Sequence, residues 1–223
     1  AGRGELLIIM AATSICKSHF LVQLGANAMR AGRNVLHYTF ELTEVAVGLR
    51  YDANFTKISA TDIPDHRKEV DEFYDKNDLG RLVIKEYPTG SATVQTLRNH
   101  IEKLALKNFI PSLVIVDYAD IMKSSRAFGE MRHELKQIYE DLRGLAQELN
   151  VPIWSASQLN REGAGAEFAG NEQMAESYGK AWVADFLMSL SRKPEEKENG
   201  TGKFYISKNR NGKDGCIFAH DEG

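Results

Sequence analysis

Lys17 and Ser18 stand side by side where a short loop passes into a helix, and they are the residues of this sequence best placed to bind phosphate. An apolar run at residues 6–10 comes before the loop, and residues 19–24 after it have the composition of a helix. A strand, a tight loop and the start of a helix together present backbone N–H groups to the phosphates of a nucleotide. We therefore expect Lys17 to reach the β- and γ-phosphates of a nucleoside triphosphate and the Ser18 hydroxyl to hold Mg²⁺. The simpler alternative is a buried strand that turns into a helix and binds nothing.

The predicted phosphate loop departs from the usual pattern at one residue. Glycine is usual directly before the lysine, and this chain has Cys16 there. A loop that wraps phosphates favours a backbone conformation that a Cβ resists, which costs about 1 kcal/mol or more. We predict weakened but real nucleotide binding by the loop, whose residues are Ala11, Ala12, Thr13, Ser14, Ile15, Cys16, Lys17 and Ser18.

Glu41, Asp117 and Gln158 each stand at the end of, or just after, an apolar segment that is predicted to be a strand. Because ligands bind at the carboxyl ends of parallel strands, we expect all three near the phosphate loop. Asp117 would then hold Mg²⁺ through a water molecule beside Ser18. Glu41 would align and deprotonate the attacking water, and Gln158 would sense the third phosphate. The alternative is that each acid caps a turn and the glutamine merely solvates a loop.

The apolar periodicity predicts strands and helices that alternate along the chain, which is typical of an α/β fold. We expect a mostly parallel central sheet covered by helices, with an antiparallel hairpin at the C-terminal edge. Apolar residues at positions 131, 135, 138, 142, 145 and 149 predict a helix packed on the core. A Gly- and Ala-rich segment, residues 162–171, predicts a mobile loop. The predicted strands are residues 6–10, 34–40, 82–84, 113–117, 151–156, 186–190, 204–207 and 216–219, and the other predicted helices are residues 19–30, 44–55, 61–76 and 94–107.

The composition is that of an ordinary globular domain, with 43% hydrophobic and 26% charged residues among 223. A net charge of −3 argues against a protein that coats nucleic acid through a broadly basic surface, although it allows a ring that grips one strand through a few loops. No apolar run is long enough to cross a bilayer, so we expect no membrane contact. The two cysteines are too few for a disulfide framework or a zinc site, so a reducing cytoplasm is the expected compartment.

Five blocks of the sequence, taken in order, carry a family likeness. They are the loop from Ala11 to Ser18, Thr39-Phe40-Glu41-Leu42, Val116-Asp117-Tyr118-Ala119-Asp120-Ile121-Met122, Leu149-Asn150-Val151-Pro152-Ile153 through Ser157-Gln158-Leu159-Asn160-Arg161, and Lys208-Asn209-Arg210-Asn211-Gly212. These blocks resemble the ATPase domain of DnaB-type replicative DNA helicases, a branch of the RecA-like P-loop NTPases, and the likeness is to the phage type. The resemblance covers nearly the whole chain. It implies a single RecA-like domain over residues 1–223, which we expect to be a fragment of a longer chain, in the cytoplasm of a bacterium or a phage-infected host.

The resemblance implies that Lys208 and Arg210 reach the nucleotide of a neighbouring subunit in a ring hexamer. Alternate residues of a strand point the same way, so the two cations would face one side and compensate phosphate charge in trans. Two exposed basic residues on an edge strand, discouraging aggregation, are the alternative. For single-stranded DNA the family uses loops that face the central channel, which here correspond to residues 123–126 and to a segment ending at Lys180.

The sequence therefore predicts an ATP-dependent replicative DNA helicase motor that hydrolyses ATP at subunit interfaces and moves along single-stranded DNA. Two alternatives stay open: a nucleotide-binding ring component in which Cys16 impairs catalysis, and a RecA- or KaiC-like ATPase that does not unwind DNA. We expect the isolated chain to form rings weakly or not at all, because nothing before Ala1 resembles the segment with which the family docks neighbouring subunits.

Overall fold

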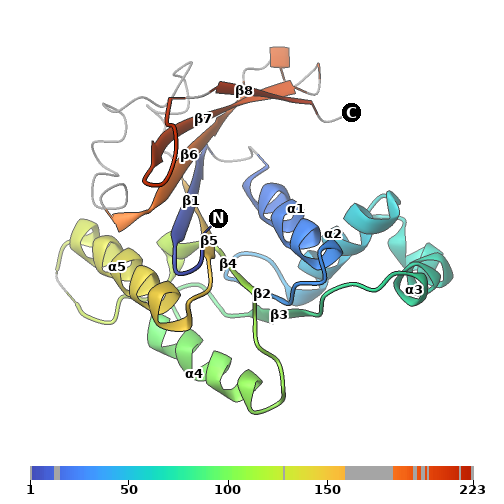
Figure 1. The fold of residues 1–223 in the computed structure, drawn as a ribbon, viewed down its shortest axis with the longest axis horizontal. Coiled ribbons are helices and arrows are strands. Elements are labelled where there is room, and N and C mark those ends of the chain that lie inside the picture. Colours follow the sequence, from blue (N-terminus) through green and yellow to red (C-terminus); the bar gives the residue numbers. More distant parts are fainter. Residues whose placement is uncertain are drawn as a thin grey trace.

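The structure is a computed structural model, and its described residues form a single eight-stranded sheet (Figure 1). The order of the strands across the sheet is β3-β2-β4-β5-β1-β6-β7-β8. Their bounds are β1 Leu6–Ala11, β2 Val35–Thr39, β3 Leu82–Glu86, β4 Leu113–Asp117, β5 Ile153–Gln158, β6 Phe186–Ser191, β7 Thr201–Asn209 and β8 Ile217–Asp221. The residues that the structure describes are 2–12, 16–127, 129–158, 183–192, 195–196, 199, 201–215 and 217–221.

Strands β1 to β6 run parallel to one another, whereas β7 pairs antiparallel with both β6 and β8 at one edge of the sheet. This confirms the predicted mostly parallel sheet with an antiparallel hairpin at its C-terminal edge. Parallel strands need long crossovers, which the intervening helices provide, whereas the hairpin partner can return directly. The carboxyl ends of the parallel strands consequently meet at one edge of the sheet, and their amino ends meet at the opposite edge.

Helices cover both faces of the sheet, because the strand residues alternate between two apolar clusters. In β1, Leu6 and Ile8 point into one cluster, whereas Leu7 and Ile9 point into the other. One face packs against α4 (Val94–Ala105) and α5 (Met131–Leu149). The other packs against α1 (Lys17–Arg30), α2 (Glu44–Thr56) and α3 (Arg67–Lys76), and Figure 1 shows these helices to the right of the sheet. Two 3-10 turns, η1 (Ile63–His66) and η2 (Ala119–Ile121), complete the helical segments of the described residues.

Helix α5 confirms most of the predicted core stripe and corrects its first residue. Ile138, Leu142 and Leu145 are buried against the sheet, but the Met131 side chain is 77% exposed. Met131 is the first residue of the helix, one turn ahead of the part that lies on the strands. The apolar spacing therefore continues beyond the region in which the helix has a neighbour to pack against.

Some of the predicted features fall outside the described residues. They include the mobile loop predicted at residues 162–171, the predicted DNA-contacting residue Lys180, and Thr13, Ser14 and Ile15 of the phosphate loop. Within the part of the chain that the structure describes, no helix is both long and apolar enough to cross a membrane.

Candidate functional site at the carboxyl edge of the sheet

The predicted phosphate loop begins at the carboxyl end of β1 and ends at the start of α1. Lys17 is the first residue of α1, and its Nζ donates hydrogen bonds to the carbonyl oxygens of Ala11 and Ala12 at 3.3 and 3.0 Å. The first turn of α1 contains no acidic residue, and the Cys16 side chain makes no capping hydrogen bond. The helix therefore presents its N–H groups and the positive end of its dipole without an anion built into the first turn.

Asp117 is the last residue of β4 and lies on the same face of the sheet as α1. Strands β2 and β4 are neighbours, with Thr39 paired to Asp117, and the Phe40 N–H donates to the Asp117 carbonyl at 2.8 Å. Glu41 follows two residues after β2. The structure thus brings Asp117 and Glu41 to the edge where Lys17 and Ser18 begin α1, and the charges of Lys17, Glu41 and Asp117 act on one another there.

The Asp117 carboxylate is buried in a manner that is unusual for a charged group. Asp117 is only 1% exposed, and neither of its carboxylate oxygens has a hydrogen-bond partner among the described residues. Burial raises the pKa of this carboxyl above its usual value, and the charge of Glu41 raises it further. The nearby Ser18 hydroxyl and the positive charges of Arg50 and Lys17 favour the charged form. A buried carboxylate without partners is costly, so it calls for a ligand that would satisfy it.

Lys17 lies at the centre of this group of charges. Burial lowers the pKa of its ammonium below the usual value, while the carboxylates of Glu41, Asp117 and Asp120 act in the opposite direction. The ammonium is therefore held among carboxylates and backbone carbonyls at the mouth of the loop. Polyphosphate oxygens could replace these partners, since they offer the same kind of acceptor with more negative charge.

Gln158 lies beside the first residue of the phosphate loop, because the parallel pairing of β1 and β5 places it next to Ala11. Its backbone N–H donates to Asp120 Oδ2 at 3.0 Å. The same carboxylate accepts hydrogen bonds from Ser157 Oγ at 2.9 Å and from the Tyr139 hydroxyl at 2.7 Å. Asp120 therefore ties the end of β5 to the turn after β4.

Asp120 is a site residue that sequence reasoning missed. It stands three residues after Asp117 in the turn η2. An acidic residue in a turn is usually interpreted as a solvent-exposed residue without a specific role. Its only signal in the sequence is that a second acid follows a strand which already ends in an acid.

Lys208 and Arg210 lie at the opposite edge of the sheet from the phosphate loop. Strand β7 is antiparallel to β6, with Lys208 paired to Leu187, so its end lies level with the start of β1. Lys208 lies level with Ile8 and Asn209 with Leu7, so three to four residues of β1, about 10–13 Å at roughly 3.3 Å per residue, separate the end of β7 from Ala11. The end of β7 thus lies toward the edge of the sheet opposite the predicted phosphate loop of its own chain. The prediction that both lie on one strand is wrong in detail, because β7 ends at Asn209 and Arg210 belongs to the turn that follows.

Cys16 has the left-handed backbone conformation that the sequence led us to expect, with φ 33° and ψ 24°. Replacing it with glycine should raise the free energy of unfolding by about 0.5–1 kcal/mol, because relief of the Cβ strain is partly offset by the flexibility of glycine in the unfolded chain. Denaturant unfolding would measure this change. Cys16→Ala is the matched control, since it removes the thiol but keeps the Cβ, and equal gains from Ala and Gly would contradict the explanation. ATP titration of the same proteins tests the predicted weak binding, because only the glycine variant should then bind more tightly.

Comparison with known proteins places this site in a family. The family model described as "DnaB-like helicase C terminal domain" matches residues 1–220. The chain belongs to the DnaB-like helicase family. Its family domain is the ATPase domain, and the mostly parallel sheet with a phosphate loop after β1 is the fold expected for it.

Individual relatives agree with this assignment. A "DnaB-like replicative helicase" of Enterobacteria phage T4 is 35% identical over 201 residues, which are 85% of this chain and 42% of that protein. The "Replicative DNA helicase DnaB" of Haemophilus influenzae is 29% identical over 233 residues, covering 96% of this chain and 48% of the relative. The chain thus spans a little under half the length of these relatives.

Two solved structures share the fold. One, described as "The Structure Of A DnaB-Like Replicative Helicase And Its Interactions With Primase", superposes with a TM-score of 0.83 at 19% identity, covering 99% of this chain and 55% of the other. The second is described as an ATPase domain and superposes with a TM-score of 0.82 at 20% identity, covering 98% of this chain and 81% of the other. The phage-type likeness expected from the sequence agrees with the T4 relative.

Proposed function

We propose that this DnaB-like ATPase domain hydrolyses ATP at interfaces between subunits and thereby moves its protein along single-stranded DNA. The observation that carries the proposal is the buried carboxylate of Asp117, which has no hydrogen-bond partner among the described residues and faces the Lys17-Ser18 start of α1. A site of this kind fits a magnesium-bound nucleotide, since the ion and the phosphates satisfy the groups that the protein leaves unsatisfied.

The residues of this chain would divide the chemistry among them. Lys17 binds the β- and γ-phosphates, and the N–H groups of the loop and of α1 surround them. Ser18 through its hydroxyl and Asp117 through a water molecule would hold Mg²⁺, which neutralises charge on the phosphates when bound. Glu41 orients the attacking water and accepts its proton.

Gln158 would contact the γ-phosphate and transmit its presence or absence. Its amide can donate to a phosphate oxygen and accept a hydrogen bond elsewhere. Asp120 holds the backbone of Gln158 in place, so that the side chain projects from a fixed point beside the loop. Loss of the γ-phosphate would then change the conformation of the segment that follows β5.

Lys208 and Arg210 would complete the site of a neighbouring subunit. They lie toward the edge of the sheet opposite their own loop, and in a ring that edge of one subunit would lie against the loop of the next. Cations that arrive in trans stabilise charge on the transferring phosphate and raise the hydrolysis rate by roughly 10³- to 10⁵-fold in related systems. The isolated domain should accordingly be a weak ATPase and largely monomeric. Light scattering that showed a stable hexamer without nucleotide would contradict this.

DNA is the partner that the relatives' names and the loop positions favour. The relatives are replicative DNA helicases, and the exposed residues Lys123 and Arg126 follow the turn after β4, on the same sheet edge as the nucleotide site. Conformational changes caused by hydrolysis would be transmitted to single-stranded DNA bound by such loops. Residues 1–223 would act as one motor domain within this assembly.

Mixing experiments test the arrangement directly, using the full-length protein that carries this domain. Lys17→Ala removes the loop's cation but leaves Arg210 intact, and Arg210→Ala does the reverse. Each variant alone should lose DNA-stimulated ATPase activity, while their mixture should recover activity, because some interfaces combine an intact loop with an intact Arg210. A mixture no more active than its components would show that Arg210 does not act in trans.

The alternative of a catalytically impaired ring component is favoured by one observation, the strained Cys16 in the phosphate loop. ATP binding without DNA-stimulated turnover would support this alternative over the motor. ATP turnover without unwinding of a forked duplex would instead favour the RecA- or KaiC-like alternative.

A further inference from the structure

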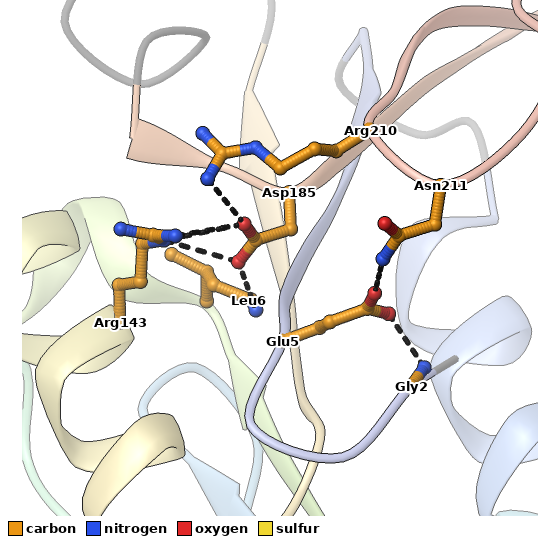
Figure 2. Close-up of polar contacts among 7 residues, drawn as sticks. All are labelled: Gly2, Glu5, Leu6, Arg143, Asp185, Arg210 and Asn211. Atoms are coloured by element: carbon orange, nitrogen blue, oxygen red, sulfur yellow. Dashed lines mark hydrogen bonds and ion pairs between the residues drawn. The ribbon is translucent and has the colours of Figure 1, made fainter.

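A buried carboxylate joins the turn that carries Arg210 to the core of the domain (Figure 2). Asp185 stands immediately before β6, and its side chain is only 6% exposed. Arg143 of α5 donates to it through Nε at 3.1 Å and through Nη2 at 3.0 Å. The Leu6 N–H donates to Oδ2 at 3.1 Å, and Arg210 Nη1 lies 3.2 Å from Oδ1.

The two arginines of this cluster are held differently. Arg143 contacts the carboxylate through two nitrogens and is 28% exposed, so its charge alone compensates that of Asp185. Arg210 contacts it through one nitrogen and is 47% exposed. Among the described residues, this ion pair is the one polar contact of the Arg210 side chain. The positive charge of Arg210 is therefore in excess, and most of its donor groups point to no other partner in this part of the chain.

The backbone of the turn is also fastened to the same edge. The Arg210 N–H donates to the Asp185 carbonyl at 3.0 Å. The Asn211 side-chain amide donates to the carboxylate of Glu5, which also accepts from the Gly2 N–H (Figure 2). The base of the Arg210 side chain is thus fixed relative to the start of β1, and only its outer atoms need to be oriented.

Ionisation of Asp185 is maintained despite its burial. Burial opposes the charged form, but the hydrogen bonds from Arg143 and Leu6 and the charges of both arginines outweigh it, and the pKa of the carboxyl lies below its usual value. Lys208 is close enough for Arg210, Asp185 and Arg143 to act on it, and burial lowers the pKa of its ammonium. The cluster thus stays anionic at its centre and cationic at its surface at neutral pH.

We propose that Asp185 is a positioning residue that holds one nitrogen of Arg210 so that the rest of its guanidinium is presented to the nucleotide of the neighbouring subunit. This inference rests on the proposed trans role of Arg210. A free arginine side chain has considerable rotamer entropy to lose when it binds. Because Asp185 already restricts the Arg210 side chain, much of this entropy is lost before the nucleotide binds. Arg143 compensates the charge of the Asp185 carboxylate, so the positive charge of Arg210 stays available to the nucleotide.

Asp185→Asn in the full-length protein tests the inference. The amide keeps the size of the side chain but loses the ion pairs, so kcat for DNA-stimulated ATP hydrolysis should fall by about 10-fold. The KM for ATP should change less than about 2-fold, since the loop that binds ATP is at the other edge. Glu148→Gln is the matched control, because it alters a carboxylate of α5 that pairs with Arg98 at 2.8 Å rather than with Arg210, and it should leave kcat unchanged.

Mixing separates positioning in trans from a structural effect on the variant's own loop. Asp185→Asn mixed with Lys17→Ala should recover activity, since the second subunit supplies a well-placed Arg210, and Asp185→Asn mixed with Arg210→Ala should not. The reverse pattern would overturn the inference, because it would mean that the substitution damages its own nucleotide site. If Lys17→Ala and Arg210→Ala fail to complement each other, the proposed function itself is wrong. Should the Asn variant fail to assemble, Asp185→Glu, which keeps the negative charge, should show the same pattern with a loss of about 3-fold.

Discussion

Replacing Asp117 with asparagine is expected to make the protein more stable and at the same time to slow its ATP hydrolysis by roughly 10²-fold or more. The Asp117 carboxylate is buried without a hydrogen-bond partner among the described residues, and burial raises its pKa. The neutral, isosteric amide removes the charge from this environment. We expect the free energy of unfolding to rise by about 1 kcal/mol or more, because an unpaired buried charge costs more than an unpaired buried amide.

The pH dependence of this effect follows from the direction of the pKa shift. A carboxyl whose pKa is raised in the folded state binds its proton more tightly there than in the unfolded chain. The wild type therefore loses stability as pH rises from the ordinary aspartate pKa through the higher folded value. The advantage of Asp117→Asn should be absent below that window and complete above it. Denaturant unfolding at several pH values would measure it.

Catalysis should respond in the opposite direction to the same substitution. An amide cannot hold a magnesium-bound water as a carboxylate does, and loss of this contact should lower kcat by roughly 10²-fold or more. Asp120→Asn is the matched control for stability, because Asp120 accepts three hydrogen bonds and its replacement should destabilise the fold. If Asp117→Asn is less stable than the wild type at neutral pH, our interpretation of the buried carboxylate is wrong.

Replacing Glu41 with glutamine should leave ATP binding intact and slow hydrolysis by roughly 10²- to 10⁴-fold. The amide has the same shape but cannot accept the proton of the attacking water. Because Glu41 is exposed, we expect little change in stability. Single-turnover hydrolysis and ATP titration would separate the chemical step from binding.

Glu44 offers a control for this substitution within the same segment of the chain. It lies in the first turn of α2 and pairs with Lys85, at 3.1 Å, on the solvent side. Glu44→Gln should change the hydrolysis rate by less than about 2-fold, since a surface ion pair contributes little. Equal rates for the Glu41 and Glu44 variants would mean that another group activates the water.

Much of the fold could be predicted because its signals are local. Alternation of apolar residues placed successive side chains of β1 in two different clusters, as the period of a strand requires. The spacing in α5 predicted its buried stripe, but it could not show that Met131 extends past the sheet, because that depends on where the neighbouring strands end.

The candidate site was predicted where a topological rule applies. Residues that follow parallel strands meet at the carboxyl edge, which is why Lys17, Glu41, Asp117 and Gln158 were placed together from the sequence. The roles assigned to them remain predictions. The backbone strain at Cys16 was also expected from the sequence, because glycine is usual at the position before the lysine. Cys16 has the left-handed conformation there despite its Cβ.

The sequence by itself determined which polar residues follow which strands, and the family to which the chain belongs. Motif spacing and apolar alternation depend only on residues that are close in the sequence. Only the tertiary structure decided that Asp185 holds both Arg143 and Arg210, and that Asp120 holds Gln158. Leu6 and Asp185 are 179 residues apart, and Asp120 and Gln158 are 38 apart. Contacts over such separations depend on strand order and register across the whole sheet, and no local pattern records them.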